Sequence, residues 1–337
     1  MEVRGCVLVN QKVSVIICSK DRHEDLIRAV TSVRRSGKTG ETAEIVVVEE
    51  TDEPQAIPGV QYVSIPRRDY GFGYARNVAV KEAAGELLLF IDDDCEAEEG
   101  WAEELVAPLL ENPAIHGVAG AVLVKNCGLL GYAENILGFP GGGLRYLHQA
   151  RGQVVPTVYL STCNCAYRRD AVLNAGGFSE EARAGGEDAL LAERVATVGL
   201  CVYAPRAVVY HRARDRFGAI FTWFVRRGYG ELATWERHLD RAFYARYLLR
   251  SSWTVRVAAF LILVSAFPTL ARFVPALALL YYGVVLWRFR FARAYPAHRR
   301  AWRVVPLVKM TMDLGTEAGR WKYMLERRRP WRRRDRS

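Results

Sequence analysis

The first hundred residues alternate between unbroken apolar runs and segments in which apolar residues recur every three or four positions. The runs lack polar alternation, so they predict strands covered on both faces, at 13–18, 45–48, 62–65 and 87–91. Helical spacing of Leu26, Val30 and Val33 predicts a helix after the first strand, and a second is expected over 74–84. This order predicts an α/β fold with a mainly parallel, Rossmann-like sheet.

The pattern becomes less regular after residue 94. Apolar spacing predicts helices from Trp101 and Gly185, and strands are expected at 118–124, 154–160, 202–203 and 207–210. Residues 137–143 hold four glycines and a proline, which predicts a mobile loop. No GxGxxG or GxxxxGK[ST] motif occurs, since the stretch 71–76 lacks the third glycine. A dinucleotide or P-loop site is therefore not predicted.

Polar side chains follow the predicted strands where each strand ends. Asp92, Asp93 and Asp94 come directly after 87–91, while 19–22 and 49–52 follow two other strands. Residues in extended backbone alternate sides, so Asp92 and Asp94 are expected to point together and Asp93 away. Neighbouring carboxylates repel unless a cation lies between them, and oxygen ligands suit Mg²⁺ or Mn²⁺. The alternative is a solvated turn that caps the helix beginning near Trp101.

Further along the chain, several short motifs occur in an order that resembles the family 2 glycosyltransferases over about residues 10–215. Single motifs of this kind are weak, but together and in register they are specific; they are 13–22, Glu49–Glu50, 75–77, Asp92-x-Asp94, 176–178, 186–188 and His211. The resemblance implies a GT-A fold, a nucleotide-sugar donor, a divalent cation (Mn²⁺ or Mg²⁺) and inversion at the anomeric carbon.

The resemblance also implies roles for individual residues. Asp188 would be the general base with Glu187 as its neighbour, and the cation would lie on Asp92, Asp94 and His211. Donor-binding positions would be Ser19, Asp21, Arg22, Glu50, Arg76, Asn77, Asp92 and Asp93. Taken alone, two acids at a helix N-terminus are explained by the helix dipole, and His211 by a surface position.

Two positions depart from the family pattern. Cys18 stands where the family usually has proline, and Glu49–Glu50 stands where it usually has two aspartates. The longer side chains leave the base of the nucleotide open, with a UDP-sugar mildly favoured.

Charge divides the chain into two parts. The net charge of +10 combines −10 over residues 1–205 with +20 over residues 206–337. In the basic part, arginines bracket two uncharged runs of fifteen residues, 257–271 and 273–287, with basic flanks at 237–250 and 288–303. Each run makes about 22 Å of helix, short of a hydrocarbon core of roughly 30 Å, although snorkelling arginines extend the reach. We expect a membrane hairpin with both ends in the cytoplasm; the alternatives are a buried soluble hairpin and one lying in the interface plane.

These patterns predict four regions: a catalytic domain at 1–215, amphipathic interfacial helices at 216–252, a transmembrane or re-entrant hairpin at 253–290, and a basic helix and tail at 291–337. Within the second region, 217–238 is equally compatible with a helix packed on the catalytic domain. The tail at 327–336 is expected to attract anionic lipid, and the adjoining apolar hairpin argues against nucleic acid as the partner.

The N-terminal residues and the cysteine pattern indicate the expected cellular location. Residues 1–12 carry no signal-peptide pattern, and the seven scattered cysteines lack a C-x-x-C pair, which indicates reduced, mostly packing thiols. The expected location is the inner membrane, with the catalytic domain in the cytoplasm.

The sequence therefore favours a metal-dependent inverting glycosyltransferase that acts on a hydroxyl of a lipid-linked or surface-glycan acceptor. A sugar-phosphate nucleotidyltransferase is one rival, but residues 18–22 lack the glycine-rich loop it needs. The other rival is a non-catalytic membrane scaffold with a transferase-like domain, against which the intact acids Asp92, Asp94 and Asp188 argue.

Overall fold

The computed structural model describes residues 12–183, 185–238, 249 and 252–327. The chain divides into two compact units, the first comprising 1–127, 134–183 and 187–213, and the second 128–133, 184–186 and 214–337. The expectations for the N-terminus at 1–11, for most of the basic flank at 237–250 and for the tail beyond Arg327 lie outside the described residues. The four-region division of the chain remains a prediction.

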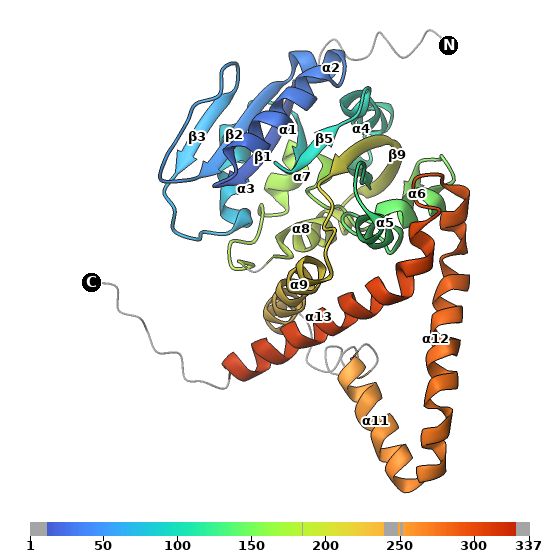
Figure 1. Cartoon of the computed structure of the whole chain (residues 1–337). Coiled ribbons are helices and arrows are strands. Elements are labelled where there is room, and N and C mark those ends of the chain that lie inside the picture. The colour runs from blue at the N-terminus through green and yellow to red at the C-terminus, as the bar shows by residue number, and fades with distance from the viewer. Residues whose placement is uncertain (1–11, 184, 239–248, 250–251, 328–337) are drawn as a thin grey trace. The chain divides into compact units, whose positions relative to one another are not determined.

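The first unit is built on one mixed sheet (Figure 1). Its strands are β1 Val13–Lys20, β2 Glu44–Glu50, β3 Gln61–Ile65, β4 Leu87–Ile91, β5 Cys95–Ala97, β6 Ile115–Leu123, β7 Val155–Pro156, β8 Asn164–Arg168 and β9 Leu200–His211. They are ordered β3-β2-β1-β4-β8-β6-β9-β5, with β7 beside β9. The first four strands pair in parallel, as the sequence predicted, whereas β8 runs antiparallel to both β4 and β6.

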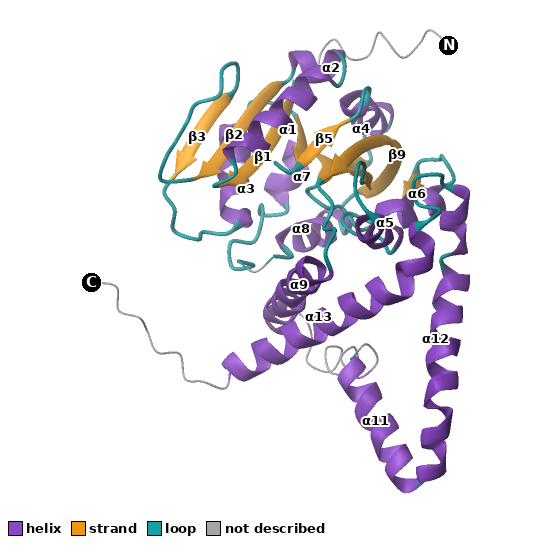
Figure 2. Ribbon diagram, in the orientation of Figure 1, coloured by secondary structure: helices purple, strands orange, loops and turns teal. Residues whose placement is uncertain are grey.

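Helices cover both faces of this sheet (Figure 2). They are α1 His23–Arg35, α2 Lys38–Thr42, α3 Phe72–Glu82, α4 Trp101–Glu111, α6 Gly143–Ala150, α7 Arg169–Asn174 and α8 Glu187–Ala196, while α5 Leu129–Ile136 begins in the second unit and ends in the first. Alternate strand residues feed two cores: Leu89 packs with α1 and α4 on one face, and Phe90 with α3, α7 and α8 on the other. All five β4 residues are buried, as expected for a central strand.

Two strand predictions and one cap prediction were wrong. The run 154–160 contributes only Val155–Pro156, and the two short strands expected after residue 201 form one continuous β9. Helix α1 is not capped by Asp21, which has a φ of 51°; Arg22 occupies the N-cap position without a side-chain cap bond. The expected loop at 137–143 is a series of turns between α5 and α6, and its mobility remains a prediction.

No strand was predicted at 164–168, where the structure has β8. Its first residue, Asn164, looks like a loop residue, but its side chain is buried and fully used. The amide donates to the carbonyls of Ala121 (2.9 Å) and Ala207 (2.8 Å), and the oxygen accepts from the indole of Trp101 (2.8 Å). These bonds hold β8 where the β6–β9 register shifts, so a polar residue is satisfied inside the sheet.

The second unit is helical. It contains α9 Phe217–His238, α11 Trp253–Ala266, α12 Val274–Arg288 and α13 Val305–Arg327, with 3-10 turns at Pro268–Phe273, Arg290–Ala294 and Ala301–Val304. Helices α9 and α13 approach closely because glycines line their contact. A Cβ on Gly228 would lie 2.1 Å from the Thr316 carbonyl oxygen, and one on Gly319 would lie 2.1 Å from that of Val225. The Arg320–Glu231 ion pair, at 3.0 Å, joins the same two helices.

Helices α11 and α12 form a hairpin within the second unit (Figure 1). Its apolar side chains are exposed: none of α11 is buried, only Val285 of α12 is, and Ile262 and Leu279 are 71% and 75% exposed. This exposure contradicts the alternative of a soluble hairpin buried in a core. Among the described helices none is both long and apolar enough to cross a membrane, so a transmembrane pair at 253–290 is not supported.

Candidate active site

The acidic cluster lies at the carboxyl ends of β1, β2 and β4, all within the first unit. Lys20 and Glu50 are register partners at the ends of β1 and β2, and β4 delivers its three aspartates beside them. Asp93 is buried at 1% exposure, as expected, whereas the side chains of Asp92 and Asp94 are 27% and 16% exposed. Asp92 and Asp94 are therefore the carboxylates available to a ligand. The expected extended backbone is wrong, because Asp93 and Asp94 lie in a turn closed by a hydrogen bond from the Cys95 N–H to the Asp92 carbonyl at 3.1 Å.

Asp93 anchors this loop to the β1 end. Its carboxylate accepts a hydrogen bond from Ser19 Oγ at 2.7 Å and lies 2.6 Å from the Arg22 guanidinium. Arg22 also reaches Asp94 at 2.9 Å. Burial raises the pKa of Asp93 to about 7, with Arg22 opposing the shift. These contacts fix the loop backbone, and so the direction of its neighbours.

His211 lies beside Asp94 because β5 pairs with the end of β9, where Cys95 is opposite His211. Nε2 is 3.2 Å from Asp94 Oδ1, and Nδ1 is 2.7 Å from the Arg212 carbonyl oxygen, to which it donates. A histidine whose second nitrogen donates to a carbonyl is typical of metal ligands. Carboxylates with an imidazole fit Mn²⁺ better than Mg²⁺, which prefers oxygen ligands. Among the described residues, His211 groups with Asp94 and Cys95, and separately with Asp92 and Cys163, in sets whose ligand atoms lie within 4.8 Å of one another. Asp92, Asp94 and His211 do not form such a set together, so the predicted cation site on these three residues remains a prediction.

Arg76 links the aspartate loop to the start of α8. The guanidinium is buried against the Phe72 and Phe178 rings, lies 3.3 Å from Asp92, and pairs with Glu187. Burial raises the pKa of Glu187, and Arg76 partly offsets that effect. The sequence placed Arg76 near the donor, and the structure gives its guanidinium two carboxylate partners.

Asp188 follows Glu187 in the first turn of α8 and is partly exposed. Its Oδ1 accepts from the backbone N–H of Ala189 at 2.8 Å. The N-terminus of a helix favours an ionised carboxylate. Asp188 thus presents a partly exposed carboxylate next to the Arg76–Glu187 ion pair, and its role as the general base remains a prediction.

The other predicted donor residues lie at the borders of the cluster. Glu50 accepts from the backbone N–H groups of Arg68 and Asp69 (3.0 and 2.6 Å), and so holds the segment after β3. The side-chain amide of Asn77 donates to the Phe178 carbonyl at 3.0 Å, and its oxygen accepts from the Phe178 N–H at 2.8 Å. These bonds hold the segment between α7 and α8 in place. Asp21 is more exposed and pairs with Arg67 at 3.1 Å. Their roles in donor binding remain predictions.

The structure adds one residue that the sequence reading treated as a packing thiol. Cys163 Sγ donates to Asp92 Oδ2 at 3.1 Å, because β8 runs antiparallel to β4 with Asn164 opposite Ile91. Burial raises the pKa of Cys163 well above its usual range. Only recognition of β8 as a neighbour of β4 would have brought this thiol into the predicted site.

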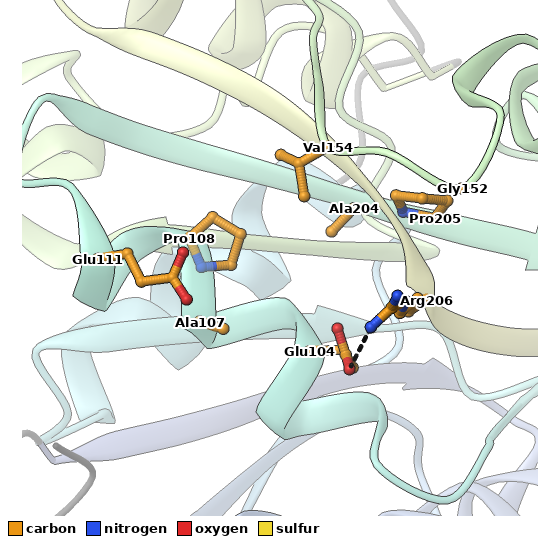
Figure 3. A pocket seen from close by; sticks show the side chains of 9 residues that line it. All are labelled: Glu104, Ala107, Pro108, Glu111, Gly152, Val154, Ala204, Pro205 and Arg206. Atoms are coloured by element: carbon orange, nitrogen blue, oxygen red, sulfur yellow. Dashed lines mark ion pairs between the residues drawn. The ribbon is translucent and has the colours of Figure 1, made fainter. Parts of the chain in front are cut away.

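A pocket of about 180 Å³ lies elsewhere on the first unit, between α4 and β9 (Figure 3). Glu104 and Arg206 face each other across it at 4.0 Å. It contains none of the residues described above. We do not assign the chemistry to it.

Comparisons with known proteins match part of the chain to one family and to several of its relatives. Residues 14–174 match the family described as Glycosyl transferase family 2. The chain is 28% identical over 235 residues to the O-antigen biosynthesis protein RfbC of Myxococcus xanthus, covering 64% of this chain and 18% of that protein. It is 34% identical over 122 residues to the glucosyl-dolichyl phosphate glucuronosyltransferase of Haloferax volcanii, covering 33% and 38%. The chain thus spans well under half the length of these relatives.

Among solved structures, the mannosyltransferase PcManGT from Pyrobaculum calidifontis, in complex with GDP-Man and Mn²⁺, is similar in fold. The TM-score is 0.56 at 19% identity, over 91% of this chain and 87% of that one. The similarity extends beyond the residues that the family match covers.

Proposed function

The chain belongs to glycosyl transferase family 2 through residues 14–174, and on that premise we propose that it is a metal-dependent inverting glycosyltransferase with a nucleotide-sugar donor. The observation that carries this proposal is a chain of contacts: His211 lies beside Asp94 and within 4.8 Å of Asp92, and Arg76 pairs with both Asp92 and Glu187, the residue next to Asp188. It joins a donor set for a cation to a proton acceptor within one unit of the fold.

In this mechanism, Asp188 accepts the proton of the acceptor hydroxyl as that oxygen attacks the anomeric carbon. Arg76 and Glu187 hold the start of α8 in position, so that the Asp188 carboxylate is oriented before the acceptor arrives. Asp92, Asp94 and His211 would hold the cation, which supplies positive charge to the leaving diphosphate. A single proton acceptor suits direct displacement, and hence inversion.

Donor binding is the first test. With Mn²⁺ present, the matching nucleotide sugar at roughly a hundred times its Kd should raise the Tm by about 5–10 °C. Measuring the Tm with a panel of UDP- and GDP-sugars, with and without Mn²⁺, identifies the nucleotide sugar that binds. Asp94→Asn should lose the Mn²⁺-dependent part of the shift, whereas Glu111→Gln, an exposed acid of the same unit, should keep it. A shift that is equal in Asp94→Asn would contradict the proposed cation site.

The acceptor and the location of the protein extend the same proposal. The relatives named above include an O-antigen biosynthesis protein and an enzyme acting on a dolichyl phosphate substrate, which supports a lipid-linked or surface-glycan acceptor. The exposed apolar hairpin α11–α12 and its basic flank support association with an anionic inner-membrane surface, with the catalytic domain in the cytoplasm. The hairpin would enter the membrane without spanning it.

Membrane association has its own test. Replacing Ile262, Leu279 and Leu280 with serine should weaken binding to vesicles of phosphatidylethanolamine and phosphatidylglycerol at least ~30-fold, because these side chains would leave water on insertion. The matched control replaces three exposed apolar residues of the first unit, Val158, Val198 and Leu200, and should bind as the wild type does. Equal vesicle co-sedimentation by both triple variants would overturn the hairpin assignment.

A further inference from the structure

Three strand ends bring a thiol, an imidazole and a carboxylate together. Asp92 follows β4, Cys163 precedes β8 and His211 ends β9. One ligand atom from each lies within 4.8 Å of the others. The family resemblance assigned the cation to Asp92, Asp94 and His211, and gave Cys163 no part in it.

The local geometry suits a bound metal ion. Cys163 Sγ and Asp92 Oδ2 are already 3.1 Å apart. His211 Nδ1 donates to the Arg212 carbonyl, which leaves Nε2 as the nitrogen that faces the carboxylates. Tetrahedral zinc bonds of roughly 2.0–2.3 Å place neighbouring ligand atoms about 3.3–3.8 Å apart. Small side-chain adjustments are sufficient to reach that spacing.

We propose that Cys163 makes this a binding site for thiophilic cations, with Zn²⁺ held by Asp92, Cys163 and His211. The inference rests on the cation site of the proposed function and adds a sulfur donor to it. Zn²⁺ favours sulfur and nitrogen ligands, and it binds such sites more tightly than Mn²⁺ does. On binding, the S–H bond of Cys163 is replaced by an S–Zn bond and the proton passes to the buffer. No oxidation or reduction occurs.

A consequence for the transferase follows from the shared ligands. Zn²⁺ on Cys163 occupies Asp92 and His211, which the proposed function reserves for the Mn²⁺ that accompanies the donor. The two ions therefore compete, and Zn²⁺ acts as an inhibitor that excess Mn²⁺ relieves.

A second thiol makes an internal comparison possible. Asp94, Cys95 and His211 also lie within 4.8 Å of one another. Cys95 is 1% exposed, and its partner Asp94 is engaged by Arg22 at 2.9 Å. The Asp92 side chain is more open than that of Asp94, so the geometry favours Cys163 as the ligand.

The experiment uses Co²⁺ as a spectroscopic probe on the purified full chain, with no sugar present. The wild type should bind one Co²⁺ with a sulfur-to-cobalt charge-transfer band in the near ultraviolet. Cys163→Ser keeps a hydroxyl that can donate to Asp92, but it should lose the band. Its Zn²⁺ affinity should fall roughly 10- to 100-fold, while Mn²⁺ affinity stays within about two-fold. Cys165→Ser, two residues further along the chain, is the matched control and should keep the band.

Several outcomes would overturn the inference: no band in the wild type, a band retained by Cys163→Ser, or a band lost in Cys95→Ser instead. Circular dichroism and a thermal melt show that each variant is folded, and Cys163→Ala gives a second route if the serine variant is not. Because the readout needs neither donor nor acceptor, the transferase proposal can fail while the cobalt band remains, or survive when the band is absent.

Discussion

Replacing Asp188 with asparagine should lower the rate of sugar transfer by about 10²–10⁴-fold, because the acceptor hydroxyl loses the group that takes its proton. Asparagine is nearly the same size and can still accept from the Ala189 N–H, so the start of α8 should stay in place. Donor binding does not need this proton acceptor. The Mn²⁺-dependent thermal shift of the variant should therefore match that of the wild type.

The measurement is release of nucleoside diphosphate from the donor identified by the thermal-shift panel, with and without acceptor. Glu193→Gln, an exposed acid on the same helix, serves as the control and should transfer at the wild-type rate. Undiminished transfer by Asp188→Asn would remove the base assignment. Loss of transfer together with loss of donor binding would point to a structural role for Asp188. Donor binding without any transfer in the wild type would favour the non-catalytic scaffold.

Replacing Arg76 with methionine should destabilise the first unit by about 3–5 kcal/mol, because Glu187 would be left as a buried carboxylate without its partner. The check is denaturant unfolding followed on the first unit. The double variant Arg76→Met, Glu187→Met should recover most of that loss, since a buried ion pair replaced by apolar groups of similar size is often nearly neutral.

Arg194→Met is the matched control for this cycle. Arg194 also packs at α8, but its guanidinium donates to the Ala175 and Gly177 carbonyls, at 2.7 and 2.6 Å. Arg194→Met should lower the free energy of unfolding by less than Arg76→Met does. Adding Glu187→Met to Arg194→Met should not restore the stability that was lost. If the Arg76 double variant is no more stable than Arg76→Met alone, the Arg76–Glu187 interaction does not dominate the stability of this region.

Much of the sheet could be predicted because its strands are apolar throughout. The run at 87–91 has no polar residue, so its burial in the centre of the sheet followed from the sequence. β8 could not be predicted in the same way. Asn164 is tolerated inside the sheet only because Trp101, Ala121 and Ala207 satisfy its side chain, and those partners are 43 to 63 residues away in the chain.

The site shows the same contrast between local and distant information. The burial of Asp93 between two more exposed aspartates was predicted from local alternation, and the structure confirms the burial, but Asp93 and Asp94 lie in a turn and not in extended backbone. The pairing of Arg76 with Glu187 joins residues 111 positions apart, and the contact of Cys163 with Asp92 depends on the pairing of β4 with β8. No local pattern in the sequence indicates either of these long-range contacts. The chemical roles of the site residues remain predictions.

Helix α13 has a practical consequence for work with shortened proteins. It follows the apolar hairpin in the chain, yet it lies against α9, and Glu317 accepts from Ser252 and Thr254 at 2.7 and 2.8 Å. Ending the protein before the hairpin, to improve its solubility, would also strip α9 of this neighbour and uncover Phe224, which is now buried and lies beside Gly315 of α13. An internal deletion should preserve these contacts. It would remove the hairpin, join its two ends with a short linker and keep α13.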